Sequence, residues 1–133
     1  MRILVTGGKG FIGSSIVEKL QGMGHDVSVL DNSEDYGVIS AVDLKNLYKW
    51  RQRNWKKIYI ISGDVTDKLN VLSAFRPKPD IVIHLASYPR AKIVNVDPVF
   101  GTNNIIGGTV NLLWHCQHMS VKKFVFVSSS MIY

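Results

Sequence analysis

The feature that most constrains this chain is a cluster of glycines that directly follows an apolar run and opens a helical pattern. Gly7, Gly10 and Gly13 stand three residues apart, just after the strand-like run at residues 3–5. In such a strand–turn–helix unit the first glycine permits a tight turn, the second lets the backbone approach a pyrophosphate, and the third lets the helix pack close to the strand. A glycine cluster alone is a weak signal, because ordinary turns also need glycine.

The order of elements around this turn gives the cluster its context. We expect five short strands, at residues 3–5, 27–30, 57–61, 81–84 and 123–127. Helices are expected at residues 11–20, at about 40–50, over a short stretch after Asp67, and at about 97–118. Alternating strands and helices imply right-handed crossovers. The sequence therefore predicts an α/β fold, a Rossmann-type doubly wound parallel sheet with strand order 3-2-1-4-5 and a ligand crevice where the order reverses.

Two of the expected helices have a recognisable apolar face. In the first helix that face consists of Ile12, Ile16, Val17 and Leu20. In the last helix the packing face is expected to carry Val110, Leu112 and Leu113.

An acidic residue ends the second expected strand. Asp31 comes about 18 residues after Gly13, where a carboxylate accepts hydrogen bonds from the adenosine ribose hydroxyls. A carboxylate at that place repels a 2′-phosphate, so NAD is favoured over NADP. The alternative is a turn residue before Asn32. Lys9, inside the glycine turn, either touches a phosphate or points to solvent.

Much of the formal net charge of +6 comes from one stretch. Its cations, interleaved with Trp50 and Trp55, are Lys45, Lys49, Arg51, Arg53, Lys56 and Lys57. Cations next to stacking rings could bind single-stranded nucleic acid, but no nucleic-acid motif accompanies them. We interpret the stretch as a solvated helix face whose tryptophans anchor it to the domain, and nucleic acid is the least favoured partner.

Composition narrows the remaining classes. The 133 residues amount to one domain. No apolar run approaches the ~18 residues of a membrane span, and the N-terminus has no basic segment followed by a signal core, so we expect no membrane partner and a cytoplasmic location. Cys116 has no second cysteine and no neighbouring ligand at metal spacing. We therefore expect Cys116 to be a small buried hydrophobe and expect no metal site.

The glycine turn and Asp31, together with several later motifs, carry a family resemblance. The later motifs are Gly63-Asp64-Val65-Thr66-Asp67, His84-Leu85-Ala86-Ser87, Gly108-Thr109-Val110-Asn111 and Ser128-Ser129-Ser130-Met131-Ile132-Tyr133. Over its whole length the chain resembles the extended short-chain dehydrogenase/reductases, in the NAD-dependent epimerase/dehydratase group. Within that group it looks most like the N-terminal part of the UDP-galactose 4-epimerases.

The resemblance implies NAD as the cofactor and a set of residues around it. The implied contacts are Gly7, Gly10, Phe11, Ile12, Gly13, Asp31, Asn32, Asp64, Val65, Leu85, Ala86, Ser87 and Asn104. Asp64 would accept a hydrogen bond from the adenine amino group, with Val65 packed beside the ring; the alternative for Asp64 is a helix-cap or turn role. Leu85, Ala86 and Ser87 would line the cofactor at the end of the fourth strand.

The implied catalytic residue is Ser129, four residues before Tyr133. Its hydroxyl would hydrogen-bond the substrate oxygen that gains or loses a proton. Tyr133 ends the serine motif and is not the tyrosine of the family's Tyr-x-x-x-Lys pair, which would come later. We therefore expect residues 1–133 to be the N-terminal, NAD-binding part of a Rossmann domain, truncated after strand five, without the C-terminal substrate domain and inactive alone.

Two departures from the family pattern leave alternatives open. Asn104 stands one residue early and Ile105 takes its usual place. One residue rotates a side chain by about 100° around a helix, so either a bulge returns Asn104 to the crevice or that contact is lost. After Ala86, the Lys and Val-Gly-Glu-Ser of the 4-epimerases are absent, and Arg90 or Lys92 is either a cation for a phosphate or a surface charge.

The sequence leaves two alternative functions for this protein. In the favoured one the full-length protein is an enzyme that moves a hydride from a nucleotide-sugar carbon to NAD and back. An epimerase, a 4,6-dehydratase or a decarboxylase could begin with this sequence. The resemblance also implies a homodimer, formed through the helix at about 97–118, whose exposed face carries Trp114 and His118. The alternative is a non-catalytic module that binds or senses NAD(H), because fold alone does not give function.

Overall fold

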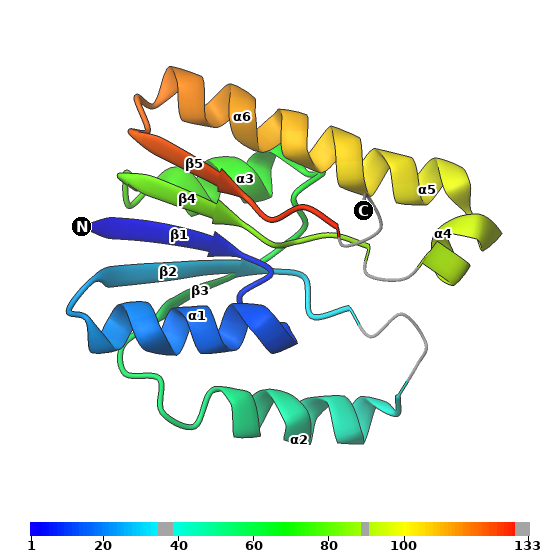
Figure 1. Ribbon diagram of the computed structural model, residues 1–133, viewed down its shortest axis with the longest axis horizontal. Helices are drawn as coiled ribbons and strands as arrows, with labels where there is room; N and C mark the ends of the chain where they lie inside the picture. The colour runs from blue at the N-terminus through cyan, green and yellow to red at the C-terminus, as the bar shows by residue number, and fades with distance from the viewer. Residues whose placement is uncertain (35–38, 89–90, 130–133) are drawn as a thin grey trace.

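Five parallel strands form the centre of the fold (Figure 1). The computed structural model describes residues 1–34, 39–88 and 91–129. The strands are β1 (Arg2–Thr6), β2 (Asp26–Asp31), β3 (Tyr59–Ser62), β4 (Ile81–His84) and β5 (Lys123–Phe126). Their order in the sheet is β3-β2-β1-β4-β5, and every pairing is parallel. The predicted fold class and strand order are confirmed, and the order reverses between β1 and β4.

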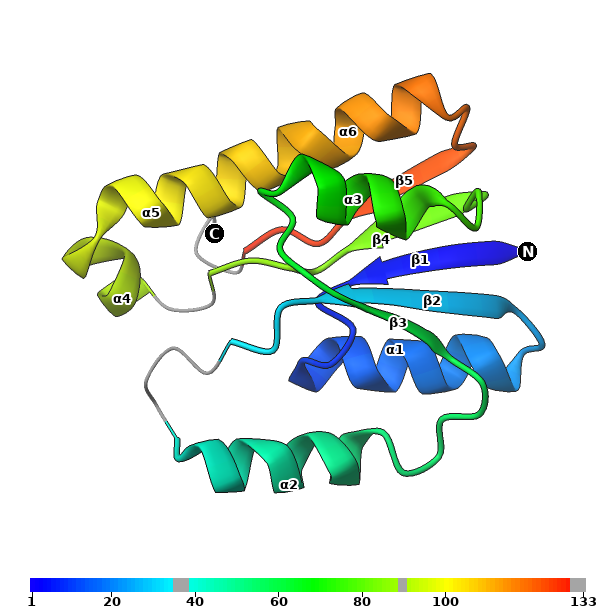
Figure 2. The same ribbon diagram turned by 180° about the vertical axis from the view of Figure 1, so that it is seen from behind.

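Helices cover both faces of this sheet (Figures 1 and 2). On one face lie α1 (Phe11–Gly22) and, outside it, α2 (Ala41–Arg51). On the other face lie α3 (Lys68–Phe75) and α6 (Gly108–His118), which contact each other. This doubly wound arrangement leaves the ends of the strands free to carry loops.

Short polar residues begin the helices where the sequence predicts helix starts. The Ser40 side chain accepts a hydrogen bond from the Asp43 N–H at the start of α2. Asp67 accepts bonds from two backbone N–H groups at the start of α3. Because such caps satisfy N–H groups that have no partner within the helix, they fix where each helix begins.

The long helix expected at about 97–118 is divided into three segments. They are α5 (Pro98–Thr102), the π-helical segment η1 (Asn103–Gly107) and α6. In Figures 1 and 2 the labelled α5 and α6 lie along one continuous rod. Thus the bulge that was one of the two alternatives for Asn104 is present. The sequence did not predict the helix α4 (Ala91–Val96), which is too short to show a countable apolar period.

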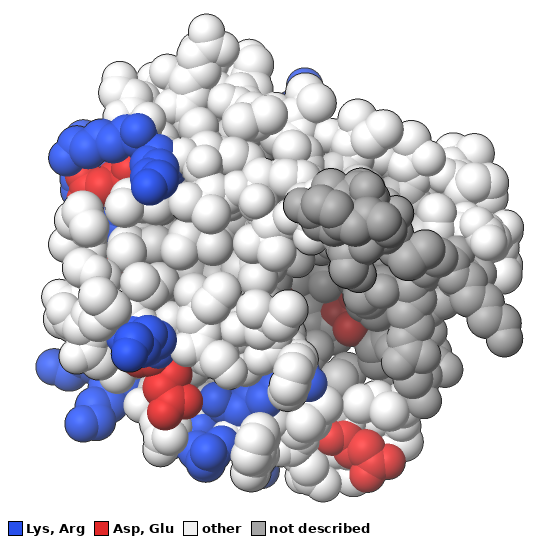
Figure 3. Space-filling view, viewed as in Figure 1, with Lys and Arg blue, Asp and Glu red and all other residues white. Residues whose placement is uncertain are grey.

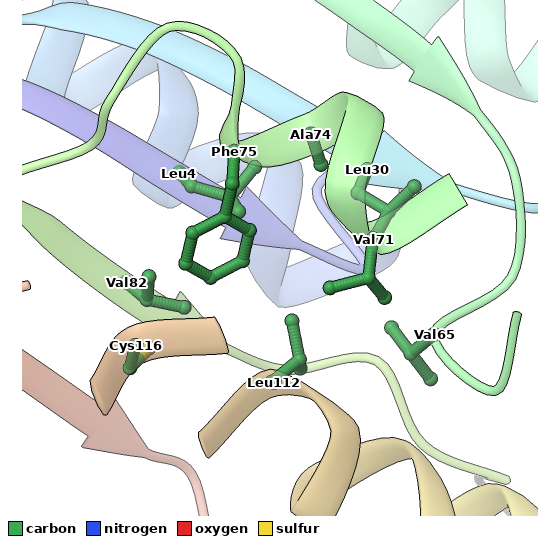
Figure 4. Close-up of a cluster of buried hydrophobic side chains, with 9 residues drawn as sticks. All are labelled: Leu4, Leu30, Val65, Val71, Ala74, Phe75, Val82, Leu112 and Cys116. Carbon is green, nitrogen blue, oxygen red and sulfur yellow. The ribbon is translucent and has the colours of Figure 1, made fainter. Parts of the chain in front are cut away.

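Side chains alternate between the two faces of each strand and form two clusters. Under α3 and α6 lies the cluster drawn in Figure 4, made of Leu4, Leu30, Val65, Val71, Ala74, Phe75, Val82, Leu112 and Cys116. Under α1 lies the second cluster, made of Ile3, Val5, Val17, Val27 and Val29. Burial on both faces explains why the inner strands β1, β2 and β4 are mainly apolar, whereas the edge strands β3 and β5 stay partly exposed.

Three predicted core residues are in fact exposed. Ile12 lies in the first turn of α1 and is 56% exposed. Val110 and Leu113 are also exposed, because α6 buries a face that contains Gly108, Leu112, His115 and Cys116. Residues spaced by four, three and one along a helix share a face, and Val110 and Leu113 fall outside it.

Cys116 is buried, as expected, and burial raises the pKa of its thiol to about 11. Among the described residues, no helix is long and apolar enough to cross a membrane.

The basic stretch matches its interpretation only in part. Trp55 packs against the cluster under α1 and anchors the segment that follows α2. Trp50 is 60% exposed, and the Arg53 guanidinium lies 4.2 Å from the centre of its ring. The expectation that both tryptophans anchor the helix is therefore wrong for Trp50, because α2 buries no residue at all.

Candidate cofactor site

The predicted site residues gather at the carboxyl ends of the strands. Gly7 follows β1, Asp31 ends β2, Asp64 follows β3, and Leu85 follows β4. All strands are parallel, so these positions meet at one edge of the sheet, beside the point where β1 and β4 separate. Open α/β sheets bind ligands at this place.

The glycine turn is packed too tightly for larger residues. Gly7 has a φ of +68°, and a Cβ on it would lie 2.7 Å from the Ala86 backbone nitrogen. A Cβ on Gly13 would lie 2.2 Å from the Gly7 carbonyl oxygen. Gly10 has an ordinary φ of −64°, and a Cβ there would lie 3.1 Å from the same oxygen. Thus Gly7 and Gly13 allow the turn to pack closely against the end of β4 and against α1. Gly10 leaves the outer surface of the turn without a side chain.

The first turn of α1 offers unpaired N–H groups. Gly10 is its N-cap and provides no side-chain cap, and the first turn contains no acidic residue. The N-terminal N–H groups and the helix dipole therefore favour an anion at this end. Phe11 and Ile12 are exposed there. A pyrophosphate fits these features, because it needs N–H donors and a surface without a side chain at Gly10.

Asp31 is held by backbone groups on both sides. Its Oδ2 accepts a hydrogen bond from the Lys9 N–H at 2.9 Å, and its Oδ1 accepts one from the Ser33 N–H at 2.8 Å. The bond to Ser33 is a local turn contact, so the turn role weighed for Asp31 is also present. A carboxylate oxygen can accept more than one hydrogen bond, so both oxygens retain capacity for ribose hydroxyls.

Asn32 and Asp64 join the ends of β2 and β3. The Asn32 amide donates to Asp64 Oδ2 at 2.8 Å. The other oxygen of Asp64 accepts bonds from the N–H and the hydroxyl of Thr66, which is the turn role considered for this residue. Val65 is buried beneath α6, where a Cβ on Gly108 would lie 2.5 Å from its Cγ2. Its side chain thus belongs to the core, and its carbonyl accepts a hydrogen bond from the Asn111 side-chain amide of α6 at 2.8 Å.

The Lys9 side chain does not simply point to solvent. Its ammonium group hydrogen-bonds the Ser33 hydroxyl and lies 4.3 Å from the centre of the Tyr48 ring. The Arg51 guanidinium donates to the Lys9 carbonyl at 3.2 Å. These contacts tie α2 to the glycine turn.

The end of β4 forms a wall beside Gly7. The Leu85 N–H donates to the Thr6 carbonyl at 3.1 Å, and the Ala86 N–H donates to the Thr6 hydroxyl at 3.2 Å. Ser87 is exposed just beyond them. The three residues implied by the resemblance thus continue β4 along the glycine turn.

Sequence reasoning missed His84, the last residue of β4. It is 2% exposed, and its ring lies near those of Phe124 and Phe126 on β5, with centroid distances of 5.9 and 5.8 Å. Its Nδ1 is 2.7 Å from Thr6 Oγ1 and its Nε2 is 3.1 Å from Thr109 Oγ1. Burial lowers the pKa of His84 to about 4. A polar residue at the end of an apolar strand was the signal available in the sequence.

Asn104 is buried within the π-helical segment, on the inner side of the rod with Gly101 and Gly108. Its side chain makes no hydrogen bond to any residue that the structure describes. The bulge therefore turns inward a side-chain amide that the described residues leave without a hydrogen bond.

The predicted catalytic residue lies at the same edge. Ser129 is exposed three residues beyond β5, the neighbour of β4. Tyr133, Arg90 and the side chain of Lys92 lie outside what the structure describes. Within the described part of the chain, no group of three or more His, Cys, Asp or Glu could hold a metal ion.

Several known proteins are similar to this chain in sequence and in fold. The chain is 34% identical over 131 residues to a UDP-glucose 4-epimerase of Mycolicibacterium smegmatis, covering 97% of this chain and 39% of that protein. The crystal structure of the Thermus thermophilus UDP-glucose 4-epimerase with NAD matches with a TM-score of 0.78 and 37% identity, over 97% of this chain and 38% of that one. The Bifidobacterium longum enzyme with NAD⁺ and UDP matches with a TM-score of 0.81 and 32% identity, over 100% and 38%.

The chain thus spans about 39% of the length of these relatives. A family model described as the NAD dependent epimerase/dehydratase family matches residues 3–133. The resemblance seen in the motifs is therefore confirmed, and the chain belongs to the NAD dependent epimerase/dehydratase family.

Proposed function

We propose that this chain is the NAD-binding part of a nucleotide-sugar epimerase or dehydratase. The observation that carries the proposal is the junction of the glycine turn with α1. Gly10 there has an ordinary backbone conformation and no side chain, above a helix N-terminus that lacks both a cap and an acidic residue. This junction fits the pyrophosphate of a dinucleotide.

The other contacts follow from the strand ends. Asp31 would accept the adenosine ribose hydroxyls, since its carboxylate is already oriented by the Lys9 and Ser33 amides. The charge of Asp31 supports NAD rather than NADP. Asp64 would meet the adenine, and Leu85 to Ser87 would border the other half of the cofactor. Asn104 would offer its side-chain amide from the rod above β4.

The chemistry of the proposal is shared between the cofactor and the protein. NAD, when bound, supplies a reversible acceptor for a hydride from a sugar carbon. Ser129 would hydrogen-bond the substrate oxygen whose proton is exchanged. The glycine turn and the end of β4 would orient the cofactor beside that oxygen. The nucleotide sugar is proposed from the relatives named above, and whether the reaction is an epimerisation, a dehydration or a decarboxylation remains part of the proposal.

A homodimer, formed through the rod of α5, η1 and α6, belongs to the same proposal. Residues 98–118 contain no Lys, Arg, Asp or Glu, and the upper right rim of Figure 3, over α5, is correspondingly almost free of charge. The outer side of the rod exposes Val99, Ile106, Val110, Leu113 and Trp114. An extended apolar surface of this kind is typical of a protein interface. A cytoplasmic location stays a prediction.

The first test is a fluorescence titration of the chain with NADH. We expect saturable binding, with weaker binding of NADPH. The variant Gly10→Val should lose NADH binding by at least about tenfold while remaining folded, because its side chain would fill the place of the pyrophosphate. Gly22→Ala is the matched control on α1, since nothing lies within 4 Å of its Cβ. If Gly10→Val binds NADH as well as the wild type does, the proposed site is wrong.

Activity is tested on the protein as its source makes it. Conversion between UDP-glucose and UDP-galactose should fall by about 10²-fold or more in Ser129→Ala, without loss of NADH binding. Binding of NADH without turnover of any UDP-sugar would instead support the alternative of a non-catalytic NAD(H)-binding module.

A further inference from the structure

A single chain of hydrogen bonds runs beneath the crevice, and its central residue has no part in the proposed contacts. The Ala86 N–H donates to Thr6 Oγ1 at 3.2 Å, and Thr6 Oγ1 is 2.7 Å from His84 Nδ1. On the other side of the ring, His84 Nε2 is 3.1 Å from Thr109 Oγ1. The Thr109 hydroxyl in turn donates to the Ile105 carbonyl at 2.6 Å.

The carbonyl end of this series of hydrogen bonds fixes the direction of the bonds at Thr109. A backbone N–H can only donate and a carbonyl can only accept. The Thr109 hydroxyl gives its one proton to Ile105, so it must accept from His84 Nε2–H. Burial lowers the pKa of His84 to about 4, so near neutral pH the ring carries this one proton only, on Nε2. Its Nδ1 then accepts the proton of the Thr6 hydroxyl, which itself accepts from the Ala86 N–H.

This series of hydrogen bonds joins two parts of the site that come from different elements of the fold. Ala86 lies against Gly7 at the ends of β4 and β1. Ile105 lies in the π-helical segment next to Asn104. His84, which is buried beside the rings of Phe124 and Phe126, links these two parts through its ring nitrogens.

We propose that His84 is a positioning residue that holds the π-helical segment, and with it Asn104, at a fixed place relative to the wall formed by Gly7 and Ala86. The inference rests on the proposed dinucleotide site.

A π-helical segment needs such a support. Its hydrogen-bond pattern is poorer than that of an α-helix, and it persists where surrounding contacts favour it. A threonine hydroxyl bonded to the carbonyl four residues earlier is itself a weak, local contact. His84 turns this local contact into one connected with β1 and β4, so that a shift of the segment would break bonds at both ring nitrogens.

The test compares two substitutions of His84 by their NADH affinity. In His84→Phe a ring still fills the space, but both hydrogen bonds are lost. We expect the Kd for NADH to rise about tenfold, because two hydrogen bonds are lost and their partners are left unpaired. In His84→Gln the amide again presents one acceptor and one donor, so the Kd should rise by less than about threefold.

Two further readouts separate positioning from general stability. Binding of 5′-ADP should change by less than about twofold in His84→Phe, because the groups proposed for the adenosine half lie at the ends of β2 and β3. In an Asn104→Ala background, His84→Phe should add less than about twofold to the Kd for NADH, because the group that it positions is gone. A merely structural role would instead weaken both ligands alike and add fully to Asn104→Ala.

Thr109→Val is the second variant, and it keeps the test decisive if His84→Phe does not fold. It removes the acceptor of His84 Nε2–H and should raise the Kd for NADH by about three- to tenfold, again without changing the Kd for 5′-ADP. Unchanged NADH affinity in both folded variants would overturn the positioning role. Failure of the wild-type chain to bind either NADH or 5′-ADP would instead overturn the proposed function, so the two failures are distinguishable.

Discussion

The crevice has two flanks that are built in opposite ways. The buried flank consists of Gly7, Ala86, His84, Asn104 and α6. There the backbone of Gly7 packs directly on that of Ala86, and the polar side chains of His84 and Asn104 are buried. On the open flank (Asp31, Asn32, Asp64 and α2), side chains at loop ends hold one another at the surface, and α2 buries no residue although it has as many residues as α6. From this difference we expect the buried flank to set the shape and stability of the domain, and we propose that the open flank selects the ligand.

The strongest challenge to this comparison is Gly13→Ala, at the base of the glycine turn. The new Cβ would lie 2.2 Å from the Gly7 carbonyl oxygen and 2.8 Å from the Gly8 Cα, which are backbone atoms that cannot move aside alone. We expect a loss of about 4 kcal/mol or more in the free energy of unfolding, measured by urea denaturation.

Gly22→Ala, at the other end of α1, is its matched control. Nothing lies within 4 Å of that Cβ, and alanine favours a helix over glycine by up to about 1 kcal/mol. Equal effects at Gly13 and Gly22 would show that the turn is not tightly packed.

The second test compares leucines on the two equally long helices. Leu112 on α6 is wholly buried under α3, whereas Leu44 on α2 is half-buried. Leu112→Ala should lower the free energy of unfolding by about 3 kcal/mol, and Leu44→Ala by less than about 1 kcal/mol. A loss at Leu44 as large as that at Leu112 would mean that α2 carries a core of its own.

The third test uses pH. His84 titrates near 6.5 in the unfolded chain, and burial lowers its pKa to about 4 in the folded one. The unfolded state therefore binds more protons between these values, so the stability contributed by neutral His84 is present above pH 6.5 and is lost as the pH falls towards 4. From pH 7 to pH 5 we expect His84 to account for a loss of about 2 kcal/mol.

The control for this prediction is His84→Gln, which cannot be protonated. Urea denaturation at several pH values should show a smaller loss on acidification in the variant than in the wild type. Parallel pH profiles would indicate that His84 is not held neutral in the folded protein.

The smallest expected effect lies on the open flank. Asp31→Asn removes the charge but keeps an amide oxygen for the Lys9 or Ser33 N–H. We expect NADH affinity to fall by about 1 kcal/mol, or roughly fivefold, and the preference for NADH over NADPH to narrow. Calorimetric titrations with both cofactors measure this. An unchanged preference, or a large loss of stability, would place Asp31 with the buried flank.

Much of this architecture could be predicted from the sequence, because it depends on local patterns. The apolar runs placed all five strands and the order of the sheet. The glycine spacing and Asp31 located the turn and the end of β2. Polar caps such as Ser40 and Asp67 marked the starts of helices.

The remainder depends on contacts between distant segments. The spacing of Asn104 showed that a bulge was one of two possibilities, but only the packing of the rod on β4 decides between them. Nothing local shows that Lys9 contacts Ser33 and Tyr48. Likewise, the role of His84 arises because Thr6 and Thr109, far apart in the chain, meet its two ring nitrogens.

The most direct test of the central claim, that a dinucleotide binds between the two flanks, is an NMR titration of the ¹⁵N-labelled chain with NADH. We expect the largest amide shifts at Gly7, Gly10 and Gly13, with further shifts near Asp31, Asp64, Ala86 and Asn104. The basic stretch from Lys45 to Arg53, on α2 and just after it, should hardly change. Shifts confined to that basic face, or no shifts at saturating NADH, would contradict the account.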